Sequence, residues 1–256
     1  MKIVVIGAGN VATHLSLAIQ QTPFRIVQVF SRSAANADAL ANRLQTRYTS
    51  QLHEITTDAD LYLFAVKDDA LAEVITQVPD NKGLWVHTAG SVPMDVFKGF
   101  TARYGVLYPL QTFSRDRAVD VRHVPFFIEA ASQEDEQVLR YFAGQLSNNV
   151  QLLDYEKRKY VHLAAVFACN FSNHMVALAY QLLESQGISP EALLPLIDET
   201  AAKIHSLSPL QAQTGPAVRN DLNVMNMQME LLSNPMMKEL YRLISKSIRR
   251  TVNSEQ

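Results

Sequence analysis

The chain begins with Met1-Lys2-Ile3-Val4-Val5-Ile6-Gly7-Ala8-Gly9-Asn10-Val11-Ala12, and the predicted fold follows from these residues. The β-branched run before the first glycine is typical of a buried parallel strand. The residues that follow fit the pattern G-x-G-x-x-A, and apolar residues then recur at helical spacing up to Ile19. A strand, a glycine-rich turn and a helix in this order predict the first unit of a Rossmann-like sheet.

The small residues of this turn have separate mechanical roles. Gly7 permits the tight turn out of the strand, Gly9 lets the backbone approach a pyrophosphate, and Ala12 lets helix and strand pack closely. The free amides at the start of the helix, at Asn10 and Val11, then face the phosphates. The turn therefore predicts a dinucleotide site, although glycines also make turns that bind nothing.

The end of the second expected strand, residues 25–30, indicates which dinucleotide binds. An NAD site usually carries Asp or Glu about 20 residues past the glycines, but this chain has Ser31-Arg32-Ser33. The planar guanidinium of Arg32 suits a ribose 2′-phosphate, and the flanking hydroxyls of Ser31 and Ser33 add hydrogen bonds. The sequence favours NADP(H); in the alternative interpretation Arg32 is a solvated loop charge.

Further strands are expected at residues 61–66, 84–86, 104–108, 124–128 and 150–153, with helices between most of them. Ligands of such sheets lie beyond the carboxyl ends of the strands. Two loops at these ends are therefore predicted to contact the cofactor, through Ala65, Val66 and Lys67 in one loop and Thr88, Ala89 and Gly90 in the other.

Four polar residues are candidates for catalysis: His87, Gln111, His162 and Asn170. The imidazole of His87 titrates near neutral pH and suits an acid or base, but it can equally cap the end of its strand. His162 and Asn170 fall on one stripe of a predicted helix, and that stripe either faces the substrate or bonds to other helices. No metal site is expected, since the helical half lacks a suitable ligand cluster.

The pattern changes near Asp154, after which no strand is expected up to Arg250. Asp154 is a plausible N-cap for a long helix that ends near Ser185, before Gly187. The helix is apolar nearly all round, which predicts burial, and Cys169 is expected to be a small buried hydrophobic residue. The predicted fold class is α/β, with a Rossmann-like, mostly parallel sheet in residues 1–153, an all-α domain in residues 154–250 and a tail in residues 251–256.

Composition narrows the class of protein. The net charge of −2 over 256 residues gives no basic surface for nucleic acid. The single cysteine fits a reducing cytoplasm, and the first strand starts too early to leave room for a signal peptide. No apolar run approaches the ~20 residues of a membrane helix, so a cytoplasmic protein without membrane partners is expected.

Several motifs together resemble one uncharacterised family: Gly7 to Ala12, His87-Thr88-Ala89-Gly90-Ser91, Tyr108-Pro109-Leu110-Gln111-Thr112-Phe113, His162 with the run from Ala164 to Phe171, and Gly215 to Asp221. Its members pair a Rossmann-like NADP-binding domain with a helical domain of unknown function. More distantly, the layout is similar to pyrroline-5-carboxylate reductase and the 6-phosphogluconate-dehydrogenase-like group, in which a glycine stands at the position of Asn220. The resemblance implies NADP(H) binding and a homodimer joined through the helical domain, and it names no substrate.

These observations favour an NADP(H)-dependent oxidoreductase that acts on a small carbonyl or imine compound. The cofactor supplies the hydride chemistry, and the protein supplies orientation and a proton donor. Two alternatives stay open at this point. One is a sensor or interaction protein that binds NADP(H) without turnover, and the other is a protein that uses a deazaflavin on a related fold.

Overall fold

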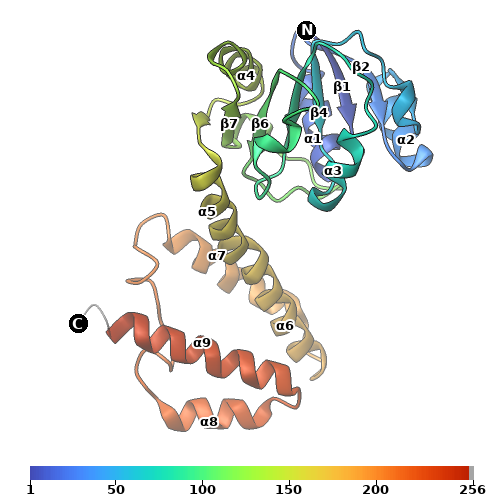
Figure 1. Cartoon of the computed structure of the whole chain (residues 1–256). Helices are drawn as coiled ribbons and strands as arrows, with labels where there is room; N and C mark the ends of the chain where they lie inside the picture. The colour runs from blue at the N-terminus through green and yellow to red at the C-terminus, as the bar shows by residue number, and fades with distance from the viewer. Residues whose placement is uncertain (254–256) are drawn as a thin grey trace. The chain divides into compact units, whose positions relative to one another are not determined.

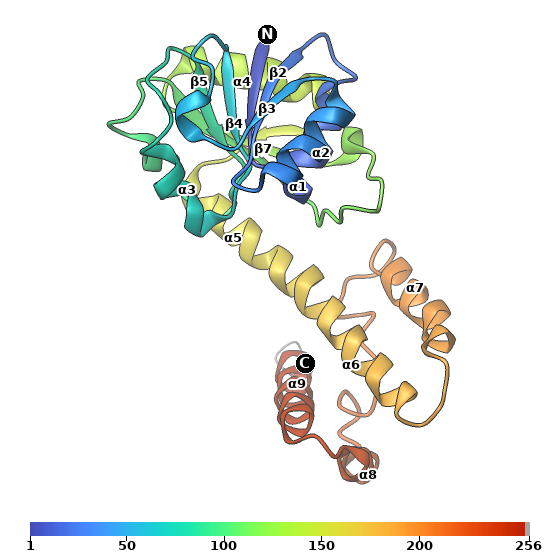
Figure 2. The same ribbon diagram turned by 90° about the vertical axis from the view of Figure 1, so that its right-hand side faces the viewer.

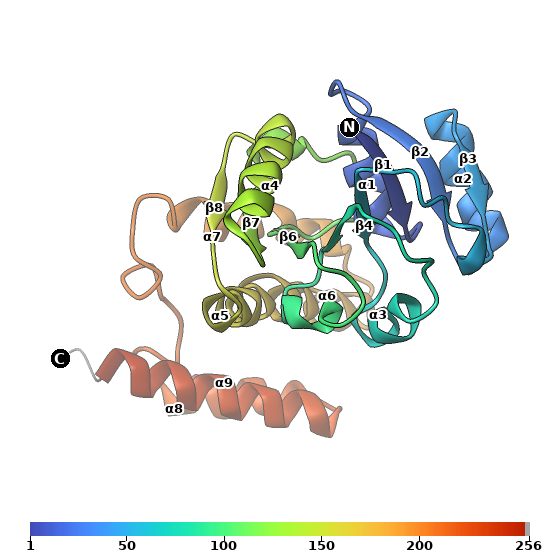
Figure 3. The same cartoon turned by 45° about the horizontal axis from the view of Figure 1, so that its top comes forward.

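The computed structural model describes residues 1–253, so the end of the predicted tail, residues 254–256, lies outside the described residues. An eight-stranded sheet with the order β3-β2-β1-β4-β5-β6-β7-β8 is the centre of the first part of the chain. Its strands are β1 (Lys2–Ile6), β2 (Arg25–Phe30), β3 (Arg47–Thr49), β4 (Leu61–Phe64), β5 (Leu84–His87), β6 (Tyr104–Pro109), β7 (Phe126–Ala130) and β8 (Val150–Leu152). Figure 3 shows β3 and β8 at opposite edges of this sheet.

Helices cover both faces of the sheet (Figures 1 and 2). One face carries α1 (Asn10–Ile19), α2 (Ala34–Leu44) and α4 (Gln133–Leu146), and the other carries α3 (Asp68–Ile75) and η2 (Met94–Phe97). Two short 3₁₀ turns, η1 (Leu52–Glu54) and η3 (Val121–His123), lie in the connections. Neighbouring residues such as Val4 and Val5 are therefore both fully buried, each in a different core. Burial on both faces explains why the strands are continuous apolar runs.

The strand pairing confirms the predicted fold class. Neighbouring strands are parallel except β6 and β7, which pair antiparallel. The edge strand β3 was not predicted, because it is only three residues long and two of them, Arg47 and Tyr48, are exposed. Since β1, β2, β4, β5 and β6 are parallel, their carboxyl ends meet along one edge of the sheet.

A long helix follows β8 and consists of α5 (Tyr155–Ala165), the π-helical segment η4 (Val166–Phe171) and α6 (Ser172–Glu184). The Asp154 carboxylate accepts the backbone N–H of Lys157 at 2.9 Å and caps the start of this helix. Gly187, with a φ of 70°, follows its last turn. Both predicted ends of the long helix are thus confirmed, whereas the π-helical interruption has no signal in the apolar pattern.

The apolar surface of this helix is exposed within the single chain, so the prediction that it is buried is wrong. Leu163, Phe167 and Phe171 are 50%, 64% and 51% exposed, and Cys169 is exposed as well. An apolar composition indicates that the helix surface has to be buried, but it does not say whether the burying residues belong to the same chain or to a partner. By length and composition alone, the helix Tyr155–Glu184 is also the one helix in residues 1–253 that is suited to crossing a membrane, which the sequence analysis did not expect.

Two compact units divide the chain at Asn170, later than the predicted boundary after residue 153. The helix α5 belongs to the first unit because it packs on the sheet, where Val161 contacts a core formed by Val106, Tyr108 and Phe127. The second unit contains α6, η5 (Pro190–Leu193), α7 (Leu194–Lys203), α8 (Leu222–Leu231) and α9 (Pro235–Asn253). The last of these helices continues past the predicted domain end at residue 250.

The turn before α8 explains how asparagine replaces the glycine of related families. Asn220 has a φ of 54°, which is the left-handed region that glycine adopts freely and asparagine tolerates. The next residue, Asp221, caps α8 by accepting the backbone N–H of Val224 at 3.2 Å. Asparagine is therefore accommodated at this position without a glycine.

Candidate functional site

The turn between β1 and α1 has the geometry that its glycines predict. Gly7 has a φ of 123°, and a Cβ at this position would overlap the backbone of the loop after β4. Gly9 is exposed at the N-cap of α1, and no heavy atom lies within 4 Å of the position its Cβ would take. Ala12 is fully buried against the sheet, and Asn10 and Val11 form the first turn of α1. The open space above Gly9 therefore lies next to the first-turn amides of α1, which have no partner within a helix, and a phosphate would bind there.

The residues after β2 lie at the neighbouring strand end, because β1 and β2 pair in parallel. Ser33 Oγ accepts the backbone N–H of Asn36 at 3.4 Å and caps α2, while Ser31 Oγ accepts the N–H of Ser33 at 3.3 Å. Both hydroxyls therefore have local structural roles. The Arg32 side chain is exposed at this strand end, where a guanidinium suits a 2′-phosphate.

Two further loops adjoin this turn at the same edge of the sheet. The pairing of β4 with β5 brings the loop Ala65–Lys67 next to the loop Thr88–Gly90. Ser91 Oγ donates a hydrogen bond to the Asp68 carboxylate and so joins the two loops. Lys67 is exposed at the start of α3. The structure therefore gathers the predicted cofactor residues of four strand ends along one edge.

A tyrosine and a histidine from distant parts of the chain meet beside these loops. Tyr108 Oη, on β6, lies 3.0 Å from His162 Nδ1, on α5. Gly90, in the loop after β5, lies against both rings: a Cβ there would lie 2.7 Å from His162 Nδ1 and 2.9 Å from a ring carbon of Tyr108. Burial, and then the charge of Asp68, raises the pKa of the Tyr108 hydroxyl to about 12. Tyr108 is therefore a protonated hydroxyl with a histidine beside it at neutral pH.

Sequence reasoning placed His162 among the candidates but missed Tyr108. The motif Tyr108-Pro109-Leu110-Gln111 carries the signal, since a tyrosine near the carboxyl end of a parallel strand is positioned like a ligand-binding residue. Tyr108 belongs both to the core and to the pair, because the residue is only 7% exposed while its hydroxyl contacts the histidine.

His87 lies at the end of β5 with its side chain fully buried. Its Nδ1 accepts the backbone N–H of Ala89 at 3.2 Å, and its ring lies 5.6 Å from that of Phe97. Burial, and then the charge of Arg158, lowers the pKa of its imidazole to about 3. These contacts are the ones that the strand-capping alternative predicts for the ring.

The other two catalytic candidates lie on a local turn after β6 and on the exposed part of the long helix. The Gln111 side-chain oxygen accepts the backbone N–H of Thr112 at 2.7 Å, which closes a local turn. Asn170 is exposed about two helical turns beyond His162. Within residues 1–253, no three His, Cys, Asp or Glu side chains gather closely enough to hold a metal ion.

A buried arginine, which the sequence analysis did not single out, holds the histidine helix against the sheet. The Arg158 side chain is fully buried, forms an ion pair with Glu129 on β7, and donates from Nη2 to the Val92 carbonyl at 2.7 Å. It lies one helical turn before His162, so both side chains point to the same side of α5. Arg158 thus determines where the imidazole of His162 lies relative to Tyr108.

Two family descriptions match successive parts of the chain. Residues 1–112 match a Rossmann-like domain, and residues 124–248 match a domain of unknown function, DUF2520. A candidate NADP oxidoreductase from Bacteroides fragilis has 48% sequence identity over 97% of this chain and 98% of its own, with a TM-score of 0.92. The chain belongs to the DUF2520 family. The resemblance predicted from its motifs is therefore confirmed.

The fold of this DUF2520 protein also occurs in more distant structures. An imine reductase from Myxococcus stipitatus, solved with NADP+, has a TM-score of 0.69 at 14% identity, covering 99% of this chain and 93% of its own. A 1-pyrroline-5-carboxylate reductase from Streptococcus pyogenes has a TM-score of 0.63 at 14% identity, covering 98% of each chain. No curated protein matches the sequence. At such identities, the two reductases establish the shared fold alone.

Proposed function

We propose that this DUF2520 protein is an NADP(H)-dependent oxidoreductase that reduces a small carbonyl or imine compound, with Tyr108 and His162 as the proton-transfer pair. The observation that carries the proposal is the 3.0 Å contact between these side chains at the same sheet edge as the glycine turn. The description of the Bacteroides fragilis relative as a candidate NADP oxidoreductase supports the cofactor and the reaction type.

The residues present fit the cofactor. The unfilled space above Gly9 and the amides of Asn10 and Val11 suit a pyrophosphate, and exposed Arg32 suits a ribose 2′-phosphate. When bound, NADPH supplies a hydride to an electrophilic carbon. The remaining task of the protein is to supply a proton to the oxygen or nitrogen atom of that carbonyl or imine.

Tyr108 is placed to donate this proton. Its hydroxyl is protonated at neutral pH, and His162 within hydrogen-bond distance can return a proton after donation. Gly90 allows both rings to approach the loop after β5, because any larger residue would collide with them. His162 is a catalytic residue in this proposal; His87 has a supporting role at the strand end.

Cofactor binding is tested by thermal unfolding with NADPH, with NADH and without ligand, on wild type and Arg32→Ala. At a ligand concentration of about 100 times Kd, we expect a stabilisation of about 2.7 kcal/mol by NADPH. Arg32→Ala should largely remove the NADPH effect, whereas Arg43→Ala, which removes an exposed charge at the far end of α2, should not. Absence of binding by either nucleotide would overturn the proposal.

Turnover is tested by NADPH oxidation with a panel of carbonyl and imine compounds. For any compound reduced, Tyr108→Phe should lower kcat by about 10²-fold or more, since it removes the acidic proton and leaves the ring in place. An unchanged kcat would remove Tyr108 from the mechanism. Tight NADPH binding with no turnover, together with a nucleotide-dependent change in association, would favour the sensor interpretation instead.

We further propose that the protein is a cytoplasmic homodimer joined through the second unit. Among its described residues, only Ala217, Leu232 and Ser245 are buried, whereas fourteen large apolar side chains of this unit are exposed. A unit with so few buried residues needs a partner that removes its apolar surface from water. A second copy of the chain can do this, because it carries the same apolar surface. Leu231, 82% exposed on α8, is the most exposed of these side chains.

Analytical ultracentrifugation tests this assembly. Leu231→Glu should shift the protein toward monomers, because it places a charge on the apolar surface of α8. Tyr141→Glu is the matched control, since Tyr141 is 56% exposed on the first unit. A monomeric wild type, or equal association of both variants, would contradict the proposal.

A further inference from the structure

The segment Gln111–Arg117 crosses from the end of β6 to the first turns of α1. Asn10 Nδ2 donates to the Phe113 carbonyl at 2.9 Å, and His14 Nε2 donates to the Ser114 carbonyl at 2.9 Å. The Phe113 ring also stacks on the His14 imidazole, with centroids 4.9 Å apart. Because Asn10 and His14 lie one turn apart on one face of α1, the helix holds two consecutive carbonyls of the crossing segment.

This attachment brings the next residue to the glycine turn. Arg115 Nη2 donates to the Ala8 carbonyl at 3.5 Å, inside the G-x-G-x-x-A turn itself. Arg115 is exposed, and the first turn of α1 contains no acidic residue that would neutralise it. Within residues 1–253 no ion pair is formed by Arg115, although Asp116 follows it in the chain. Its guanidinium therefore stands beside the amides that would receive a pyrophosphate and can offer further N–H groups to it.

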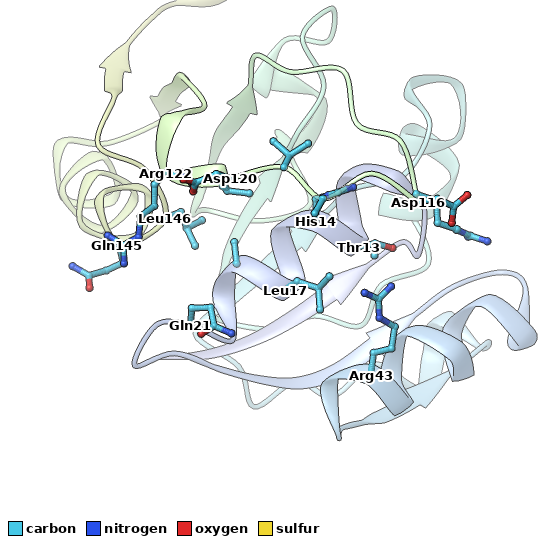
Figure 4. A pocket seen from close by; sticks show the side chains of 15 residues that line it. Thr13, His14, Leu17, Gln21, Arg43, Asp116, Asp120, Arg122, Gln145 and Leu146 are labelled. Atoms are coloured by element: carbon cyan, nitrogen blue, oxygen red, sulfur yellow. The ribbon is translucent and has the colours of Figure 1, made fainter.

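The crossing segment borders a cavity. This cavity of about 610 Å³ runs along the outer face of α1 and is lined by residues of α1, of α2, of α4 and of the chain that leads from β6 to η3, including Arg115 and Asp116 of the crossing segment. Figure 4 shows His14 and Leu17 of α1 on one side of it, with Asp116 and Asp120 from the connecting chain nearby. A segment that is mostly exposed and borders a cavity has few apolar contacts to hold it. Its position therefore depends on the two carbonyl bonds and on Arg115.

We propose that Arg115 is a cofactor-binding residue, which clamps the pyrophosphate of a dinucleotide seated on the turn from Gly7 to Ala12. The inference rests on the proposed function, because it adds a residue to that nucleotide site. The turn alone offers neutral amides to a doubly charged group, and Arg115 supplies the cation from a loop far away in the sequence. Arg32 reads the 2′-phosphate, whereas Arg115 contacts a group that NADPH and NADH share.

The test measures Kd for NADPH, NADH and adenosine 2′-monophosphate with wild type, Arg115→Gln and Arg117→Gln. Both substitutions remove one positive charge from the same exposed segment, and unfolding temperatures check that the variants fold. We expect Arg115→Gln to raise Kd for NADPH and NADH by about tenfold or more, as for loss of a charge-assisted hydrogen bond. Its Kd for adenosine 2′-monophosphate, which lacks a pyrophosphate, should be unchanged. Arg117→Gln should stay within about twofold of wild type, and Arg115→Lys should recover part of the loss.

Equal Kd values for Arg115→Gln and Arg117→Gln would overturn the inference while leaving NADPH binding intact. An equal loss for adenosine 2′-monophosphate and NADPH would also overturn it, because the charge would then act on the whole site rather than on the pyrophosphate. If the wild type binds neither nucleotide, the proposed function itself fails, and this outcome is distinct from the other two.

Discussion

Replacement of His87 by glutamine is expected to weaken the dependence of stability on pH. The imidazole is fully buried at the end of β5, and burial, followed by the charge of Arg158, lowers its pKa from 6.5 to about 3. In the unfolded chain the imidazole is in water and keeps its ordinary pKa of about 6.5. Between these values the unfolded state binds more protons than the folded state, so acid favours unfolding.

The magnitude follows from this difference in proton binding. The stability contributed by the neutral imidazole is complete above pH 6.5 and is lost progressively as the pH falls toward 3. Each pH unit in this window removes about 1.4 kcal/mol of unfolding free energy. Acidification to pH 5 therefore removes about 2 kcal/mol through His87 in the wild type, and this part is absent in His87→Gln.

Urea unfolding at pH 7 and pH 5 measures this contribution as the loss of unfolding free energy between the two conditions. His87→Gln will be less stable than wild type at both pH values, but its loss on acidification should be smaller by about 2 kcal/mol. His53→Gln, which makes the same change at an exposed histidine, should lose as much as wild type. If all three proteins lose the same amount, the argument from burial is refuted.

Two further predictions concern backbone space and a buried charge. Gly7→Ala should prevent folding, because Gly7 has a φ of 123° and a Cβ there would overlap the carbonyl of Ala65. Gly9→Ala should leave the unfolding temperature unchanged and raise Kd for NADPH, since its Cβ enters only the open space above the turn. An equal unfolding temperature for Gly7→Ala and wild type would contradict the first expectation. Arg158→Met should lower the unfolding free energy by about 3–5 kcal/mol, because it leaves the Glu129 carboxylate without its cation. Urea titrations measure this loss, and a value below about 1 kcal/mol would show that the ion pair is well solvated.

Local patterns were sufficient for the sheet and for the glycine turn. The run from Ile3 to Ile6 needs burial on both faces, and Gly7 needs a positive φ, so both features follow from neighbouring residues alone. The same holds for Asp154, since an N-cap bond spans only three residues. The short strand β3 left no pattern because most of it is exposed at the sheet edge.

The fold class, the glycine turn and the family could be predicted from the sequence alone, because each of them depends on short motifs of residues that are close together in the chain. Which polar groups meet could be seen only after the chain was folded. Tyr108 and His162 lie far apart in the sequence, and so do Arg115 and Ala8; sheet order and the seating of α5 bring them together. The tertiary structure also decided that His87 is buried and that the long apolar helix is exposed, since burial depends on what packs against a side chain.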